Sequence, residues 1–150
     1  MNINFFMQEA INQAQIALKN NEVPIGGILV DNVTNNIITK NHNQINANNN
    51  AIFHCELCII NDACKKLNSK YLNSTTLFIT LEPCTMCAAA ISMARIRRLY
   101  YGASDLKSGG IENGVKFFSH PSCHHRPEVY GGIDELRAQK LLKTFFKSKR

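Results

Sequence analysis

Long apolar runs and a leader-like start are both missing from this sequence. None of its apolar stretches approaches the ~20 residues that a helix needs to span a bilayer. The opening segment MNINFFMQEA lacks the basic region and the extended apolar core of a secretory signal peptide. These absences predict a protein of the cytoplasm that does not associate with a membrane.

Linkers, internal repeats and long low-complexity tracts are absent as well. A chain of 150 residues is long enough to form one domain whose core needs no disulfide bonds. We therefore expect a single domain over residues 1–150. The six cysteines fit this expectation, because closely spaced cysteines in a reducing compartment indicate metal or catalytic chemistry more often than disulfides.

Acidic residues are few compared with basic ones, since 11 Asp and Glu stand against 17 Lys and Arg for a net charge of +6. This excess is compatible with a polyanionic partner. Many soluble proteins carry a similar charge without binding nucleic acid. The charge alone therefore leaves the partner open.

Hydrophobic periodicity predicts an α/β organisation. We expect helices at 3–20, 54–67, 83–96 and 134–147. We expect strands at 22–31, 35–41, 75–81 and 97–102. The strand TTLFITL is densely apolar, which is typical of burial on both faces. In the second helix, the spacing predicts an apolar stripe through Leu57, Ile60, Cys64 and Leu67. Because strands alternate with helices after residue 50, some strand pairs should be parallel.

Three residues carry the donor atoms of a metal site. Cys84 and Cys87 lie three apart at the start of a predicted helix, so both thiolates can point at one position. The positive end of that helix favours their ionised form. His54 begins another predicted helix directly after a loop. A catalytic zinc site has three such protein ligands and keeps its fourth position for water.

The spacing alone leaves other sites open, because a single C-x-x-C motif also occurs in redox pairs and in closed structural zinc sites. The residues that could supply a fourth ligand are Cys55, Cys58, His120, Cys123, His124 and His125. Glu56 favours the catalytic alternative, since a carboxylate beside an activated water can take its proton and return it to a leaving group. A glutamate that complements a helix dipole is the other interpretation of Glu56.

The pattern H-x-E at 54–56 followed by P-C-x-x-C at 83–87 is the signature of the zinc nucleobase deaminases. Beyond that signature, the chain resembles the bacterial tRNA-specific adenosine deaminases over nearly its whole length. The segments that carry the resemblance are 22–30, Asn43, 80–91, 94–110, 120–121 and 145–150.

This resemblance implies a three-layer α/β/α fold of the cytidine-deaminase type, with a mixed sheet of roughly five strands. It also implies a homodimer with one zinc ion per subunit. His54, Cys84 and Cys87 would be the zinc ligands, and Glu56 would be the catalytic proton shuttle. The implied reaction is the hydrolytic deamination of adenosine to inosine by a zinc-activated hydroxide. The implied substrate is the wobble (first anticodon) position of an arginine tRNA, and no other protein partner is expected.

The resemblance further implies where the substrate binds. Asn43 matches the asparagine that hydrogen-bonds the flipped nucleoside, and Val23 matches a wall of its pocket. The closing segment 140–150 interleaves lysines with two phenylalanines, a composition that suits RNA phosphates and bases. An amphipathic last helix with solvated lysines is the alternative. The full set of expected substrate-binding residues is Asn43, Val23, Cys55, Pro83, Asp105, Lys107, Phe145, Lys149 and Arg150.

Some positions depart from the family pattern. Cys55 replaces the usual alanine between His54 and Glu56, and Ala51 replaces a proline of the preceding loop. Phe53 is larger than the usual alanine, so it must find an apolar cavity or narrow the pocket. The segment around Cys123 is expected to be structural rather than a second metal site. None of these changes removes a zinc ligand or the carboxylate.

Two other functions remain compatible with the sequence. One is a deaminase of the same fold that acts on a free base or nucleoside, of the guanine or cytosine type, which would need no basic tail. The other is a zinc-stabilised RNA-binding module without catalytic activity. Inosine formation in tRNA separates the first from the tRNA enzyme, and the effect of removing Glu56 separates the second.

Overall fold

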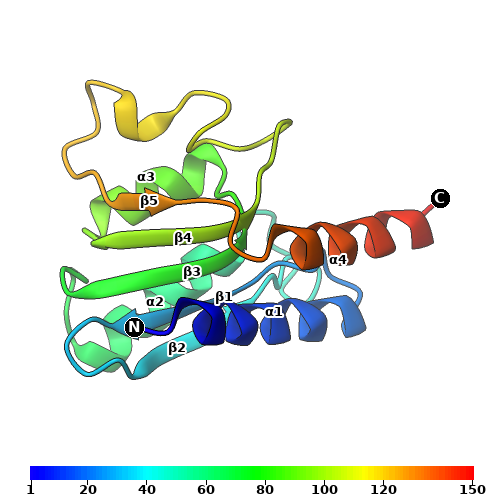
Figure 1. The fold of residues 1–150 in the computed structure, drawn as a ribbon, viewed down its shortest axis with the longest axis horizontal. Coiled ribbons are helices and arrows are strands. Elements are labelled where there is room, and N and C mark those ends of the chain that lie inside the picture. Colours follow the sequence, from blue (N-terminus) through cyan, green and yellow to red (C-terminus); the bar gives the residue numbers. More distant parts are fainter.

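Five strands form one mixed sheet with helices on both of its faces in the computed structural model, which describes residues 1–150 (Figure 1). The strands are β1 (Gly26–Asp31), β2 (Ile37–His42), β3 (Thr75–Leu81), β4 (Arg98–Ala103) and β5 (Glu128–Tyr130). Their order across the sheet is β2-β1-β3-β4-β5. β1 is antiparallel to β2 and β3, whereas β3, β4 and β5 run parallel. The predicted layered fold is confirmed.

Two helices cover each face of the sheet. α1 (Ile3–Lys19) and α4 (Glu135–Ser148) lie on one face, and α2 (Cys55–Leu67) and α3 (Thr85–Met93) lie on the other (Figure 1). The four helices predicted from periodicity are thus present. The short strand β5 and the 3₁₀ turn η1 (Phe117–Ser119) were not predicted, because three residues are too few for a periodic signal.

The central strand β3 contributes to two hydrophobic cores. Leu77 and Ile79 pack under α2 and α3, whereas Phe78 points to the opposite face and packs against α1. Alternate side chains of a strand point to opposite faces, and helices cover both faces here. This confirms the prediction that the strand is buried on both sides.

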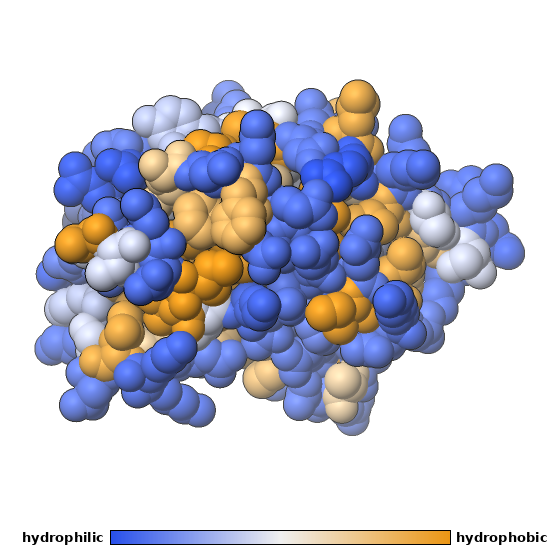
Figure 2. All heavy atoms as spheres, turned by 60° about the horizontal axis from the view of Figure 1, so that its bottom comes forward, coloured by the Kyte–Doolittle hydropathy of each residue, from blue (hydrophilic) through white to orange (hydrophobic).

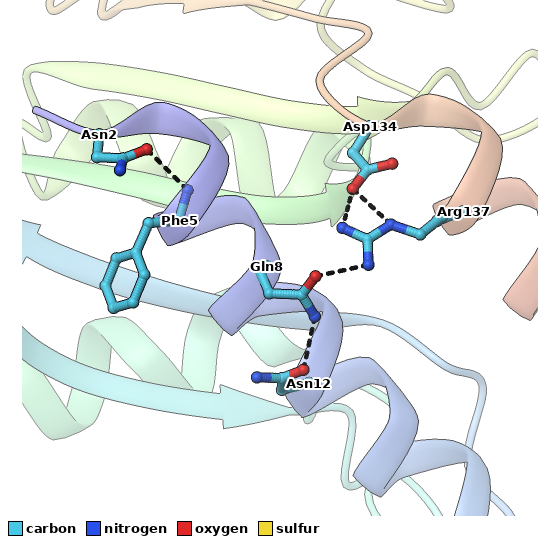
Figure 3. Close-up of polar contacts among 6 residues, drawn as sticks. All are labelled: Asn2, Phe5, Gln8, Asn12, Asp134 and Arg137. Carbon is cyan, nitrogen blue, oxygen red and sulfur yellow. Dashed lines mark hydrogen bonds and ion pairs between the residues drawn. The ribbon is translucent and has the colours of Figure 1, made fainter.

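Polar contacts hold the start of α1 and join it to α4 (Figure 3). The Asn2 side chain caps α1 by accepting a hydrogen bond from the Phe5 backbone N–H at 3.0 Å. Arg137 of α4 donates to Gln8 Oε1 of α1 at 2.6 Å and pairs with Asp134, which precedes its own helix. These two helices therefore lie side by side on one face of the sheet.

The predicted apolar stripe of α2 is right only in part, because Ile60 and Cys64 pack against the core as partly buried residues whereas Leu57 and Leu67 do not. Cys55, Ile59 and Ala63 are fully buried. The predicted stripe residues are instead half-buried or exposed: Leu57, Ile60, Cys64 and Leu67. Both sets have helical spacing, so periodicity alone does not choose between them.

α3 begins at Thr85, later than the expected start at Pro83. Cys84 is its N-cap and has extended backbone angles. The backbone before it is held extended by two contacts: Cys84 forms a β-bridge with Gly109, and the Pro83 carbonyl accepts a hydrogen bond from the Gly110 N–H at 2.8 Å. Pairing with a distant loop has therefore displaced the helix start.

Hydrophilic side chains cover most of the face shown in Figure 2, and apolar side chains gather in a patch on its left half. None of the helices combines the length and the apolar character required to cross a bilayer. The carboxyl ends of the parallel strands β3 and β4 lie next to each other, since Leu81 pairs with Ala103. In open α/β sheets, ligands bind outside the carboxyl ends of parallel strands.

Candidate active site and metal centre

Three donor atoms meet at the carboxyl end of β3. His54 Nδ1 lies 3.7 Å from Cys84 Sγ and 3.5 Å from Cys87 Sγ, and all three donors lie within 4.8 Å of one another. His54 is the N-cap of α2, and Cys84 is the N-cap of α3. The two helix starts thus bring together residues that are thirty positions apart in the chain, as the sequence predicted.

The spacing of these donors fits one zinc ion. Zinc in a tetrahedral site takes thiolates at about 2.3 Å and imidazole nitrogens at about 2.0 Å, which places a nitrogen and a sulfur about 3.5 Å apart. The two measured separations agree with that value. No other group of three or more His, Cys, Asp or Glu side chains lies close enough to hold a metal ion. The cluster therefore offers three donors, which is the number of protein ligands in a catalytic zinc site.

The two thiols of the cluster compete for a single negative charge. A hydrogen bond from Cys87, opposed by burial and assisted by His54, lowers the pKa of Cys84 to about 4. The neighbouring Cys84 and burial raise the pKa of Cys87. The hydrogen bond with Cys84 raises the pKa of His54 against the effect of burial. Both sulfurs can be thiolates together only beside a cation, which is what zinc supplies.

Glu56 lies on the first turn of α2 beside the cluster, and its side chain is only 5% exposed. Burial raises its pKa to about 7, with a further upward contribution from the charge of Cys84. The charge of His54 and the neighbouring Cys87 thiol oppose this rise in pKa. Glu56 is thus a buried acid next to the donor cluster but outside it.

A cavity of about 580 Å³ opens beside the cluster. Its lining residues are Val23, Ile25, Asn43, Ile45, His54, Leu81, Ser104, Asp105, Leu106, Lys107, Ser108, Leu142 and Phe146. The wall thus combines apolar side chains with a few polar groups, which is the usual composition of a small-molecule pocket. Four of the expected substrate-binding residues line it: Val23, Asn43, Asp105 and Lys107.

The Asn43 side chain is held in place by the start of α2. Its Oδ1 accepts a hydrogen bond from the Cys55 backbone N–H at 2.9 Å, and only 3% of Asn43 is exposed. No hydrogen bond within the protein uses its Nδ2. An amide held in this way is oriented to donate into the cavity that it lines.

Two expected substrate contacts face the protein interior instead. The Cys55 side chain is fully buried and donates from Sγ to the Asn41 carbonyl at 3.2 Å. Pro83 is buried and is bonded through its carbonyl to Gly110. Neither residue lines the cavity. Helix geometry turns Cys55 away from the direction of His54, so only its backbone supports the site.

Phe145, an expected substrate contact, does not reach the cavity, but its neighbour Phe146 does. Phe145 is buried, with 7% of its surface exposed, whereas Phe146 is 51% exposed and lines the cavity. Lys149 bends back over the Phe145 ring, at 5.3 Å from its centroid, and contacts Asn21. Successive helical residues point about 100° apart, so only one of two adjacent rings can face the cavity.

A second cavity, of about 510 Å³, continues along the last turns of α4, which project beyond the sheet in Figure 1. It shares Leu142 and Phe146 with the first cavity and is otherwise lined by Lys143, Lys147 and Arg150. We call this basic depression the tail groove. Leu142 and Phe146 were missed in the sequence, although their i, i+4 spacing on one helix face was a signal that could have found them.

The remaining departures from the family pattern lie outside the cavity. Phe53 is half-buried and is not one of the lining residues. Cys123 is buried, and its thiol donates to the His125 carbonyl at 3.1 Å. His125 in turn bonds the Ile96 carbonyl at 2.7 Å. These contacts hold the 120–126 segment against the fold and give it a structural role, as expected.

Comparison with known proteins agrees with this geometry. The MafB19-like deaminase family model matches residues 1–150. A tRNA-specific adenosine deaminase of Agrobacterium fabrum is 48% identical over 145 residues, which is 97% of this chain and 94% of that protein. One of Rickettsia bellii is 46% identical over 144 residues, covering 96% of this chain and 99% of its own length.

Solved structures extend the comparison. A structure from a study of A-to-I editing by tRNA:A34 deaminases at the wobble position superposes with a TM-score of 0.89 at 47% identity, covering 92% of this chain and 99% of that one. Guanine deaminase from Nitrosomonas europaea superposes with a TM-score of 0.83 at 16% identity, covering 95% of this chain and 83% of its own, a likeness of fold alone. By sequence, donor set and fold, this chain is a deaminase that belongs to the tRNA-specific adenosine deaminase family.

Proposed function

We propose that this enzyme converts adenosine to inosine at the first anticodon position of an arginine tRNA, with one zinc ion held by His54, Cys84 and Cys87. The observation that carries the proposal is the three-donor cluster beside a nucleoside-sized cavity, with a buried acid next to it. The 47% identity to a structure from work on tRNA:A34 deaminases supports the substrate.

Zinc bound at this cluster supplies a Lewis acid that lowers the pKa of water from 15.7 toward about 7. Glu56 moves the protons of the reaction. It takes a proton from the attacking water and passes it to N1 of adenine as the bond between oxygen and C6 forms. It then carries a second proton from that oxygen to the amino group, the C6–N bond breaks, and ammonia leaves. Because Glu56 is buried, bulk water does not compete for these protons.

Asn43 and Val23 would hold the base during this reaction. Asn43 is already oriented by the Cys55 backbone, so it can hydrogen-bond the nucleoside without losing side-chain freedom. Val23, Ile25 and Ile45 offer apolar walls to the two faces of a purine. A base must leave its stack to reach such a cavity, and bases of an anticodon loop are already partly unstacked.

The tail groove would bind the RNA on either side of the target nucleotide. Lys143, Lys147 and Arg150 lie along it and suit phosphates, while the exposed ring of Phe146 suits stacking on a base. Lys107 lines the first cavity, which shares Leu142 and Phe146 with the tail groove. We therefore assign to Phe146 the stacking role that the sequence suggested for Phe145.

The family resemblance also supports a homodimer and a location in the cytoplasm. Sedimentation of the purified protein would test the homodimer.

Inosine formation in a defined RNA tests the function. The purified protein is incubated with an unmodified arginine tRNA that carries an ACG anticodon, and zinc is measured on the same sample. We expect inosine at the first anticodon position and about one zinc per chain. A tRNA with guanosine at that position serves as the control and should stay unchanged. Release of ammonia from free guanine or cytosine, with no inosine in the tRNA, would refute the proposal.

A further inference from the structure

Glu82 is a buried carboxylate that the proposed reaction does not use, with 2% of its surface exposed. It lies between the end of β3 and the zinc-ligand segment. Its Oε1 accepts hydrogen bonds from the Asp105 backbone at 3.1 Å and from Asn113 Nδ2 at 2.7 Å. Its Oε2 accepts the three consecutive backbone N–H groups of residues 111–113 at 3.0–3.1 Å. The carboxylate thus joins the two ends of the loop, at residue 105 and at residues 111–113.

This loop is also joined directly to the ligand Cys84. Gly109 forms a β-bridge with Cys84, and Gly110 donates to the Pro83 carbonyl. A side chain at Gly109 would place its Cβ 2.5 Å from Glu82 Oε2, and one at Gly110 would lie 2.6 Å from the Thr85 nitrogen. The approach is therefore so close that only glycine fits at either position. We call residues 82–85 and 105–113 together the clamp.

The clamp carries one wall of the cavity. Asp105, Leu106, Lys107 and Ser108 line the cavity, and the Asp105 side chain shapes their turn by accepting the backbone N–H groups of Lys107 and Ser108. The loop contacts the zinc-ligand segment at Gly109 and Gly110. These two residues lie between Asp105 and residues 111–113, which Glu82 holds. The position of Lys107 relative to Cys84 therefore depends on the Glu82 carboxylate together with the backbone contacts of Gly109 and Gly110.

We infer that Glu82 is a positioning residue that places the Asp105–Ser108 wall against the metal centre and thereby sets how tightly the enzyme binds the RNA around the target adenosine. This inference rests on the proposed function. A carboxylate has two acceptor oxygens and suits five donors, whereas the isosteric amide of glutamine has one acceptor and turns two N–H groups toward donors. Glu82→Gln should therefore make the Asp105–Ser108 wall more mobile while leaving His54, Cys84 and Cys87 in place.

Three measurements on Glu82→Gln test the inference. Hydrogen exchange should become faster at the backbone amides of 105 and 111–113, while zinc stays at the content of the unsubstituted protein. KM for an anticodon stem-loop should rise about tenfold or more, the effect of losing one buried hydrogen bond to a charged group, with a smaller change in kcat. Glu128→Gln, at an exposed glutamate of β5, is the matched control and should alter none of these values.

A double variant adds a test that a general loss of stability would not pass. In Glu82→Gln the amide nitrogen faces Asn113 Nδ2, so Asn113→Asp supplies the acceptor that this arrangement lacks. We expect Glu82→Gln with Asn113→Asp to recover part of the KM and of the exchange protection. Asn113→Ala alone removes one donor and keeps the carboxylate, so it should raise KM a few-fold. This variant replaces Glu82→Gln in the test if Glu82→Gln does not fold.

Two results would overturn the inference. One is unchanged exchange at 105–113 in both single variants. The other is a loss of kcat or of zinc with KM unchanged, because Glu82 would then act on the metal centre rather than on the wall. Hydrogen exchange needs no substrate, so it tests whether Glu82 holds the loop even if the protein forms no inosine. A failure to form inosine would refute the proposed function and not the attachment of the loop.

Discussion

Two buried carboxylates of this site have pKa values displaced in opposite directions. Burial raises the pKa of Glu56 to about 7. Burial acts upward on Glu82 as well, yet the hydrogen bonds from the Asp105 backbone, from Asn113 and from Ile111 hold its pKa below its ordinary value. The difference lies in the donors, since a carboxylate that accepts several N–H groups stays charged even when buried. One side chain is thus suited to carry a proton and the other to anchor a loop.

Removing the acid should abolish turnover without dismantling the site. In Glu56→Ala we expect zinc content and tRNA binding to be retained, because Glu56 is not one of the clustered donors. The rate of inosine formation should fall by about 10²–10⁴-fold, the usual contribution of a general acid–base group. Single-turnover kinetics with the stem-loop measures this, with Glu128→Ala as the control. Full activity in Glu56→Ala would remove Glu56 from the mechanism.

Cys58 should make stability depend on alkaline pH. Burial, together with the charges of Asp62 and Glu56, raises its pKa from 9.0 to about 11. The folded protein therefore keeps the thiol proton up to a higher pH than the unfolded chain does. The stabilisation from the neutral thiol is complete below pH 9.0 and is lost as pH rises toward about 11.

Urea unfolding of Cys58→Ala and of the unsubstituted protein at several pH values tests this expectation. The other titrating groups are common to both proteins, so the difference between their unfolding free energies isolates Cys58. It should shrink between pH 9.0 and about 11. A difference that stays constant over this range would show that the thiol does not titrate there.

The two helices that supply the donor cluster begin without a side-chain cap. His54 and Cys84 occupy the N-cap positions of α2 and α3, and neither makes a side-chain hydrogen bond to its helix. A missing cap typically costs about 1 kcal/mol. In return, the positive ends of two helices lie close to one point, which favours the thiolate form of Cys84. The residues at these two N-cap positions are thus suited to binding a metal rather than to stabilising their helices.

α4 separates structural from substrate-binding side chains within one turn. Phe145→Ala should destabilise the fold by about 3–5 kcal/mol, because it removes a buried ring and leaves a cavity. Phe146→Ala should change the unfolding free energy by less than about 0.5 kcal/mol but raise KM for the stem-loop. A loss of about 1–3 kcal/mol in RNA binding is typical of removing one stacked ring.

Thermal unfolding and kinetics on this pair of variants separate the two roles. Phe145→Ala and Phe146→Ala are each other's controls, since they delete the same group from adjacent positions. The assignment would be reversed if Phe146→Ala lowered the melting temperature and Phe145→Ala raised only KM.

We expect zinc bound at the proposed site to stabilise the molecule as a whole. The donors come from two helices on one face of the sheet, so a bound ion joins segments thirty residues apart. A ligand that binds only the folded state stabilises it by mass action. Chelation should therefore lower the melting temperature by about 5–10 °C, and added zinc should restore it.

Calorimetry with and without chelator measures this effect. Cys84→Ser should have the lower melting temperature at the outset and should not respond to chelation. Cys64→Ser changes a half-buried cysteine outside the cluster and should behave like the unsubstituted protein. Equal melting temperatures with and without chelator would argue against zinc at this site.

Local patterns were enough to predict the main elements and the reactive residues. The four helices, four of the strands, and the identity of His54, Cys84 and Cys87 as donors all follow from short segments. Helix starts, apolar strands and ligand spacings depend on residues close in the chain, so they can be predicted without knowing the fold. The family resemblance added the reaction and the substrate class.

Long-range packing settled what these patterns left open. The buried side of α2, the burial of Phe145 rather than Phe146, and the anchoring of the 105–113 loop by Glu82 each depend on contacts between distant segments. A periodic pattern states that a helix has an apolar face, but rotation about the helix axis is set by the sheet and loops beside it. A glutamate before P-C-x-x-C likewise acquires its five donors only when β3 and β4 end side by side.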